Sequence, residues 1–306
     1  GKIDSISAMK IADVGACVKN LTITKVDSSV GDYQYHGIAV WITAGLFTQS
    51  RVTECKTSNG NRAAGVSLES DTAIMTHCII DHNTASGGNG VGGVRIHKSG
   101  GTMANCLVWA NTGGSGDYGV GGVSVKPDPW QLIKVVNCTI VGNKVNGNSS
   151  GGGIYVNSSL VRVVNCILFN NGGTAATEFG TVNLGRFLRC ASSGTNDSCA
   201  TWMMMSKADF TGFEADDFHL SLASLLLDGG SLDAAWYPSG ATTLDIDGNP
   251  RVSGLAIDLG CYEADQSRVI ASGAVSSLTG FEGTNYTLTA TAKGGTGGPY
   301  RYRWDL

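Results

Sequence analysis

The sequence has little of what usually points directly to a function. Of its 306 residues, 5 are proline and 15% are charged, and no apolar run reaches the roughly 18 residues that a membrane-spanning helix needs. It contains no Gly-x-Ser-x-Gly elbow, Cys-x-x-Cys pair, His-Glu-x-x-His motif or phosphate-binding glycine loop. With 44 glycines and so few charges, the composition excludes a coiled coil or a helical bundle.

Positive charge is not concentrated anywhere either. The 21 Lys and Arg residues are scattered and the formal net charge is -4, so no basic stripe is present to neutralise a run of phosphates. We therefore expect no nucleic-acid partner. The start of the chain, Gly1 to Asp4, does not open a signal peptide. We expect a soluble, monomeric module of a longer chain, with no cofactor and no bound metal.

What the chain does have is internal repetition. A short strand pattern with Cys at its centre returns along the chain, and an Asn follows at a fixed distance after most copies. A second pattern, Gly followed by alternating apolar and polar residues, recurs in phase with the first. Two strand types that repeat together indicate an all-β solenoid whose coils stack strand on strand. The second pattern occupies 37–40, 65–68, 93–96, 122–125 and 153–156.

The cysteines are predicted to form one interior row. Equivalent residues of stacked parallel strands form ladders, and parallel Cβ vectors do not converge as a disulfide requires. The row comprises Cys55, Cys78, Cys106, Cys138 and Cys166, joined by Ile80, Val108, Ile140 and Leu168. Cys190 and Cys199 flank a Ser- and Gly-rich stretch, and their pairing is left open.

The recurring asparagines are predicted to stack at a turn, because Asn tolerates left-handed backbone geometry and bonds its own backbone there. They are Asn83, Asn111, Asn143 and Asn171. For such a turn side chain, Asn143→Ala is expected to cost only about 1 kcal/mol.

With these repeats, the chain resembles the parallel β-helix proteins of the pectate-lyase-like superfamily, which implies a right-handed β-helix. Its end resembles the terminal signature of exported bacterial "choice-of-anchor Q" proteins, although Cys261 replaces the usual Ala of that pattern. The resemblance implies a bacterial, extracellular or cell-surface protein. The matching motifs are Asp217-Phe218-His219-Leu220, Leu227-Asp228-Gly229-Gly230, Asp245-Ile246-Asp247-Gly248-Asn249-Pro250-Arg251 and Ile257-Asp258-Leu259-Gly260-Cys261-Tyr262-Glu263.

Two domains are predicted. Residues 1–265 form the β-helix with a closing segment from about 174 to 265, and residues 266–306 form a short β-rich segment that resembles the start of an immunoglobulin-like or PKD-like module. Such modules need about 100 residues, so we expect the natural chain to continue beyond Leu306. Within the closing segment, Asp245 to Asn249 lacks the Gly and Glu spacing of a calcium loop, and a turn held by Asx side chains is favoured.

The outer face of the second strand type is the candidate site, because each coil adds one residue to a row along the axis. One row is predicted to contain Ala39, Ser67, Arg95, Ser124 and Tyr155, and the next to contain Trp41, Glu69, His97, Lys126 and Asn157. Glu69, His97 and Lys126 would place a carboxylate, an imidazole and an ammonium group in consecutive coils, as proton transfer requires. The predicted binding residues are Trp41, Arg95, Trp130 and Tyr155, whose aromatic members suit sugar rings.

Three functions remain open from the sequence. The first is a surface module that binds a polysaccharide or surface glycan without catalysis, with Trp41→Ala expected to weaken binding. The second is a polysaccharide lyase or glycoside hydrolase that uses the outer strand face. The third is a structural stalk. A single carboxylate in the two rows argues against hydrolysis, which needs two.

Overall fold

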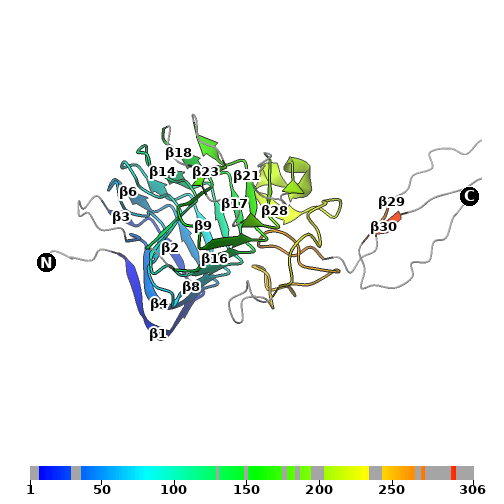
Figure 1. The fold of residues 1–306 in the computed structure, drawn as a ribbon, viewed down its shortest axis with the longest axis horizontal. Helices are drawn as coiled ribbons and strands as arrows, with labels where there is room; N and C mark the ends of the chain where they lie inside the picture. Colours follow the sequence, from blue (N-terminus) through cyan, green and yellow to red (C-terminus); the bar gives the residue numbers. More distant parts are fainter. Residues whose placement is uncertain are drawn as a thin grey trace, which may run out of the picture.

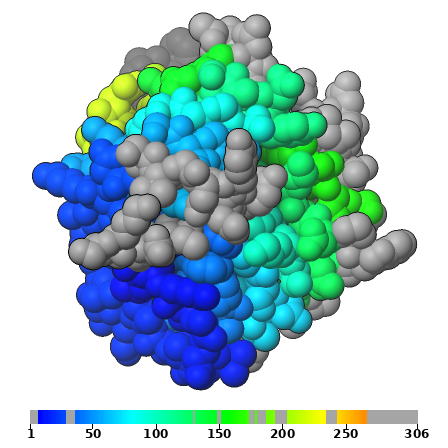
Figure 2. Space-filling view, turned by 90° about the vertical axis from the view of Figure 1, so that its left-hand side faces the viewer, coloured from blue at the N-terminus to red at the C-terminus, as the bar shows by residue number. Residues whose placement is uncertain are grey.

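The computed structural model describes residues 7–28, 36–128, 131–147, 151–173, 178–182, 187–193, 203–233, 243–265, 270–272 and 291–293. Within them the chain forms a parallel β-helix, in which six coils contribute a strand to each sheet and two partial coils follow. The coils succeed one another along the long axis, from blue to green in Figure 1. Figure 2 looks at the stack from the side of the first coils, which are blue. The fold class predicted from the repeats is confirmed.

The largest sheet has two wings joined by β1 (Met9–Lys19) and β4 (Val40–Thr48), which pair with each other. One wing, continuing from the first half of β4, contains β7 (Val66–Leu68), β11 (Val94–Lys98), β15 (Val123–Pro127), β19 (Ile154–Val156) and β23 (Phe179–Val182). The other, continuing from the second half of β4, contains β8 (Ala73–Thr76), β12 (Thr102–Ala104), β16 (Ile133–Val136), β20 (Val161–Val164) and β24 (Phe187–Leu188).

Two further sheets complete each coil. The eight-stranded sheet comprises β2 (Thr22–Thr24), β5 (Arg51–Thr53), β9 (Ile79–Asp81), β13 (Leu107–Trp109), β17 (Thr139–Val141), β21 (Ile167–Phe169), β25 (Ala191–Ser192) and β26 (Met203–Met204). The six-stranded sheet comprises β3 (Asp27–Ser28), β6 (Lys56–Thr57), β10 (Thr84–Ala85), β14 (Thr112–Gly113), β18 (Lys144–Val145) and β22 (Gly172–Gly173). Short strands with side chains that alternate inward and outward give each coil an apolar interior.

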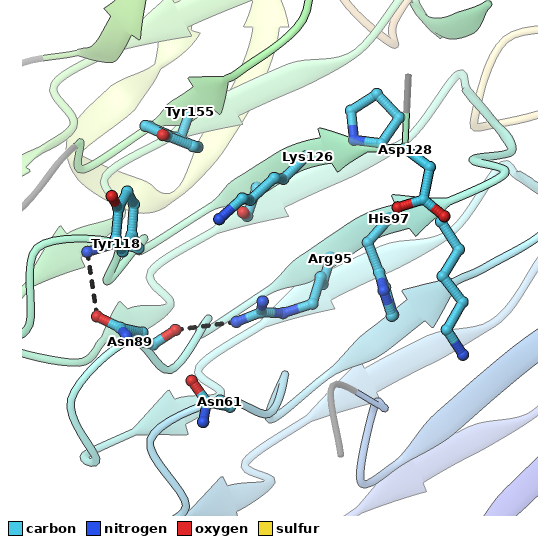
Figure 3. A pocket seen from close by; sticks show the side chains of 11 residues that line it. Asn61, Asn89, Arg95, His97, Tyr118, Lys126, Asp128 and Tyr155 are labelled. Carbon is cyan, nitrogen blue, oxygen red and sulfur yellow. Dashed lines mark hydrogen bonds between the residues drawn. The ribbon is translucent and has the colours of Figure 1, made fainter. Parts of the chain in front are cut away.

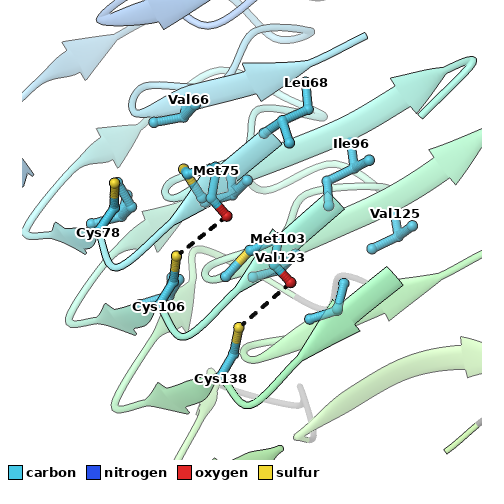
Figure 4. Packing of buried hydrophobic residues seen from close by; sticks show 14 of the residues in the cluster. Val66, Leu68, Met75, Cys78, Ile96, Met103, Cys106, Val123, Val125 and Cys138 are labelled. Carbon is cyan, nitrogen blue, oxygen red and sulfur yellow. Dashed lines mark hydrogen bonds between the residues drawn. The ribbon is translucent and has the colours of Figure 1, made fainter. Parts of the chain in front are cut away.

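Cysteines do line the interior, but Cys55 does not belong to their row. Cys78, Cys106, Cys138 and Cys166 are fully buried at equivalent positions between the second wing and the eight-stranded sheet, as Figure 4 shows for the first three. All are free thiols, so the prediction of no disulfide among them is confirmed. Cys190, also a free buried thiol, continues the row, and Cys199 lies outside the described residues.

Cys55 instead occupies the position of the recurring asparagines, because its coil pairs Thr53 with Asp81 and Lys56 with Thr84. The residue that takes the cysteine position in that coil is Ser50. The prediction of five cysteines in one row was therefore wrong for Cys55. The strand motif around Cys55 resembles the others, but it lies five residues after Ser50, at the next corner of the same coil.

The asparagines stack as predicted, but in the interior. Asn83, Asn111 and Asn143 are fully buried, and each donates from Nδ2 to the Oδ1 of the next coil's Asn at 2.9–3.0 Å. Asn171 donates to Glu178 at 2.7 Å and ends the ladder. Left-handed geometry belongs to the preceding residues, among them His82 and Ala110. Because Asn143 also donates to two backbone carbonyls, we now expect its loss to cost more than the ~1 kcal/mol predicted for a turn side chain.

A closing segment, described over 205–233 and 243–265, covers the outside of the eight-stranded sheet and is yellow to orange in Figure 1. It contains the short helices η2 (Lys207–Asp209) and η3 (Phe213–Ala215) and the antiparallel pair β27 (Phe210–Gly212) and β28 (Asp217–Leu220). Its apolar side chains pack on outward residues of the sheet such as Leu107, Val141 and Ile167. A separate antiparallel pair, β29 (Ile270–Ser272) and β30 (Thr291–Lys293), is the described part of 266–306.

The end of the closing segment is organised by buried carboxylates that accept backbone N–H groups. Asp245 accepts from Asp247, Asn249 and Glu263 at 2.7–3.0 Å, as the predicted Asx turn requires. Asp258 and Glu263 cap further N–H groups in the same way. These bonds bring Asp228, Asp245, Asp258 and Glu263, which lie far apart in the sequence, into one hydrogen-bonded unit.

This unit should make stability depend on pH. Burial raises the pKa of Glu263 to about 8, with the neighbouring charge of Asp258 adding to it, and burial raises the pKa of Asp258 to about 6. Raised folded-state pKa values mean that the protonated acids stabilise the fold below about pH 4, and that this contribution is lost as pH rises towards 8. The pKa of His219 is also raised, because its hydrogen bonds to Asp247 and Asp217 outweigh the lowering effect of burial. Its contribution to stability is therefore also lost as the pH rises.

We therefore expect urea to unfold the protein at a lower midpoint at pH 8.5 than at pH 5.5. Glu263→Gln should remove most of this difference, because an amide does not ionise. A midpoint that is independent of pH, or a Glu263→Gln variant that keeps the full dependence, would contradict the assignment.

Candidate functional site

A cleft of about 570 Å³ opens on the outer face of the first wing. Three consecutive strands supply its floor: β11 through Arg95 and His97, β15 through Lys126, and β19 through Tyr155. The complete lining is Asn61, Asn89, Arg95, His97, Lys98, Tyr118, Ser124, Lys126, Pro127, Asp128 and Tyr155. We call it the outer-face cleft; Figure 3 shows these side chains.

The lining is cationic and aromatic. Arg95, Lys98 and Lys126 are the Lys and Arg residues of the lining, and Asp128 is its one carboxylate. The ammonium of Lys126 lies 4.6 Å from the ring centroid of Tyr118, and this ring lies 6.2 Å from that of Tyr155 in an edge-on arrangement. Tyr118 is about half exposed (48%), so its ring remains accessible to a ligand. Such a surface favours ligands that combine negative charge with apolar ring faces.

Backbone contacts hold the cleft in shape. Arg95 donates from Nη2 to the carbonyl of Asn89 at 2.9 Å, and the side chain of Asn89 accepts the N–H of Tyr118 at 3.2 Å. Both bonds are drawn in Figure 3. The loops that precede β11 and β15 are therefore tied to each other and to the floor of the cleft.

A buried carboxylate, Glu69, lies at one end of the cleft. Its Oε1 contacts Nδ1 of His36 at 2.5 Å and Nε2 of His97 at 2.9 Å, and its Oε2 accepts a bond from Lys98 at 2.6 Å. Burial opposes ionisation of Glu69, but these three hydrogen bonds outweigh burial and hold its pKa well below the usual range. We call these four residues the Glu69 cluster.

The cluster also sets the state of His97. Burial lowers the pKa of His97, against the raising effect of Glu69, so the imidazole is neutral at neutral pH. The Glu69 carboxylate stays ionised and fixes the orientation of the ring. Glu69 is therefore not able to donate a proton, whereas His97, on the wall of the cleft, is a weak base.

The predicted site residues are only partly brought together. Glu69 and His97 are in contact, as expected. Lys126 pairs with His97 on the neighbouring strand, but its ammonium lies in the cleft over the ring of Tyr118. Arg95 and Tyr155 line the cleft. Trp130 lies outside the described residues.

Trp41 was placed in the wrong row. β4 pairs Trp41 with Ser67, so Trp41 belongs with Arg95 and Tyr155. Ala39, predicted for that row, is buried two residues before Trp41. Trp41 does not line the cleft: its ring stacks on His36 at 3.7 Å, and the ammonium of Lys10 lies 4.0 Å from its centroid.

Four residues that build the cleft and the Glu69 cluster were not predicted from the sequence: His36, Lys98, Tyr118 and Asn89. All except Lys98 lie in connections between strands, where the sequence repeat does not predict which residues are neighbours. Lys98 follows directly on His97, and this adjacency was the one available signal.

Within the described ranges, no group of three or more His, Cys, Asp and Glu side chains is arranged to hold a metal ion. No helix among those residues is long and apolar enough to cross a membrane.

Comparison with known proteins identifies the fold family. The family model described as "Right handed beta helix region" matches residues 10–186, more than half of the chain. The chain therefore belongs to the right-handed β-helix family, as its repeats predicted. Comparisons with curated proteins and with solved structures found no match.

Proposed function

We propose that the outer-face cleft binds an acidic carbohydrate chain, at the surface or outside of a bacterial cell, without catalysing a reaction. The observation that carries this proposal is the meeting of three cations and two tyrosines in one cleft across consecutive coils. A linear glycan laid along the axis would meet a new set of side chains at each coil, at strand spacing. Cations provide attraction to carboxylate or sulfate groups, and tyrosine rings contact sugar faces.

Location and context are part of this proposal. The likeness of the end of the chain to the terminal signature of exported "choice-of-anchor Q" proteins supports a surface or extracellular setting, and so does the likeness of 266–306 to an Ig-like or PKD-like module. A stalk is less well supported, because a spacer needs no cationic cleft.

Binding is tested by titrating the full chain with polygalacturonate and with heparin. Lys126→Met and Tyr118→Ala should each weaken binding about tenfold, since an exposed charge and an exposed ring are lost. Lys144→Met, an exposed lysine on β18, is the matched control and should change nothing. Trp41→Ala should have less effect than Tyr118→Ala, because Trp41 does not line the cleft. Salt should weaken binding of both probes.

A second candidate function is β-elimination, favoured by the neutral His97 on the wall of the cleft. His97 would take the proton α to the uronate carboxyl group, the bond to the glycosidic oxygen would break as the double bond forms, and Lys126 would protonate the leaving oxygen. The same titrated samples should be assayed for unsaturated and reducing ends. We expect retention without release; release that Glu69→Gln or Lys126→Met abolishes would favour the enzyme.

A further inference from the structure

A second ladder of polar side chains runs along the outside corner between the second wing and the eight-stranded sheet. Its members share left-handed backbone geometry, with φ between 47° and 58°. They occupy the same place in six successive coils: Asn20, Gln49, His77, Asn105, Asn137 and Asn165. We call this set the corner ladder.

Most of the corner ladder is engaged. Asn165 donates to Asn137 and Asn137 to Asn105 at 3.0–3.1 Å. The closing segment covers these positions: Asn165 exchanges two bonds with the backbone of Ser231, and His77 contacts the carbonyl of Leu244 at 3.0 Å.

The first two members differ. Among the described residues the side chains of Asn20 and Gln49 make no hydrogen bond, and both are exposed. They face a crevice of about 610 Å³ that the turn 243–248 closes on its other side. This volume suits a small ligand of a few rings. We call it the corner crevice.

Charged groups around the corner crevice already have partners. Arg51 makes two bonds to Asp81 at 2.7–2.8 Å, and Asp247 contacts His219 at 2.7 Å. Asp245 is saturated by backbone N–H groups of its own turn. The groups left for a ligand are therefore neutral amides and hydroxyls such as Thr22, next to apolar Leu21, Leu46 and Ile246.

From this arrangement we propose that the corner crevice is a second binding site, for a neutral carbohydrate. An amide side chain donates and accepts at once, which suits a pair of neighbouring hydroxyl groups, and Asn20 and Gln49 offer two such amides in adjacent coils. The apolar side chains provide contact for ring faces. The corner crevice differs from the outer-face cleft in charge, so the two sites select different ligands. Each of the two proposals can therefore be tested without the other.

The test is calorimetric titration of the full chain with cellotetraose and with maltotetraose. At least one should bind saturably, and Gln49→Ala and Asn20→Ala should each raise its Kd about tenfold. Asn146→Ala, an exposed amide after β18, is the matched control. Lys126→Met should leave this binding unchanged, which separates it from binding in the outer-face cleft. Bound ligand should also slow hydrogen exchange in 243–248.

Absence of binding by both probes would overturn the proposal, as would binding that Gln49→Ala and Asn20→Ala leave intact. Both residues are exposed, so neither variant should unfold, and unchanged melting temperatures would show this.

Discussion

Cys106→Asp is expected to destabilise the protein by several kcal/mol and to abolish a cooperative melt at moderate temperature. Cys106 is fully buried between the thiols of Cys78 and Cys138, and its Sγ donates to the backbone carbonyls of Ala104 at 3.1 Å and Met75 at 3.8 Å. Burial already raises the pKa of this thiol well above its usual value. A carboxylate there would face carbonyl oxygens and thiols but no cation, and a buried unpaired charge is among the most costly substitutions.

Cys106→Ser provides the matched control, because the chain itself shows that serine fits. Ser50 takes the equivalent position one coil before Cys78, and its hydroxyl donates to the carbonyl of Thr48 at 2.7 Å. The serine variant should therefore melt close to the wild type. If urea denaturation placed Cys106→Asp within about 1 kcal/mol of Cys106→Ser, the interior position of this row would be wrong.

Arg251→Met should destabilise the closing segment by about 3–5 kcal/mol, the range for removing one partner from a buried charge network. The Arg251 side chain is 1% exposed and donates from Nη2 to the carbonyls of Asp258 and Gly260 at 2.7–2.9 Å. Its Nε and Nη1 have no hydrogen-bond partner in the described part of the chain. The guanidinium therefore acts largely by its charge, which at neutral pH offsets that of Asp258.

Hydrogen exchange measured segment by segment is the appropriate readout. In Arg251→Met the amides of Leu259 and Cys261 should exchange much faster, while those of β11 and β15 stay protected, because the coils do not depend on this network. Lys207→Met, which removes an exposed pair with Glu214, should change neither region. Equal protection of Leu259 in Arg251→Met and wild type would show that the charge is dispensable.

The sequence predicted the stacking of coils because every coil faces the same constraint. An inward residue must match its neighbours above and below, so Cys and Asn recur where the backbone recurs. The predicted pairing of residues was wrong in the coil of β4, which runs through both wings as a single strand. β4 lacks the turn that separates the wings in the later coils. Gly37 therefore pairs with Ala63 and not with Gly65, and Trp41, two residues after Ala39, takes the position predicted for Ala39.

The candidate site could be predicted only where strands build it. Arg95, His97 and Lys126 were found because strand neighbours share a face whatever the loops do. Tyr118 and His36 reach the site from connections whose path depends on packing, and no periodicity describes that path. The corner crevice was not predictable for a related reason: it needs the turn 243–248 to fold back over coils far earlier in the chain.

The interior asparagine ladder also limits how this protein can change in length. Each Asn donates a hydrogen bond to the Asn of the following coil and accepts one from the preceding coil. The series therefore has a direction, from the N–H of Cys55 to the carboxylate of Glu178. Adding or deleting one whole coil with its Asn preserves every bond. A partial coil would leave a buried amide without an acceptor, at about 1–3 kcal/mol. Evolution can therefore lengthen or shorten the molecule in whole-coil steps, while loops between strands vary freely.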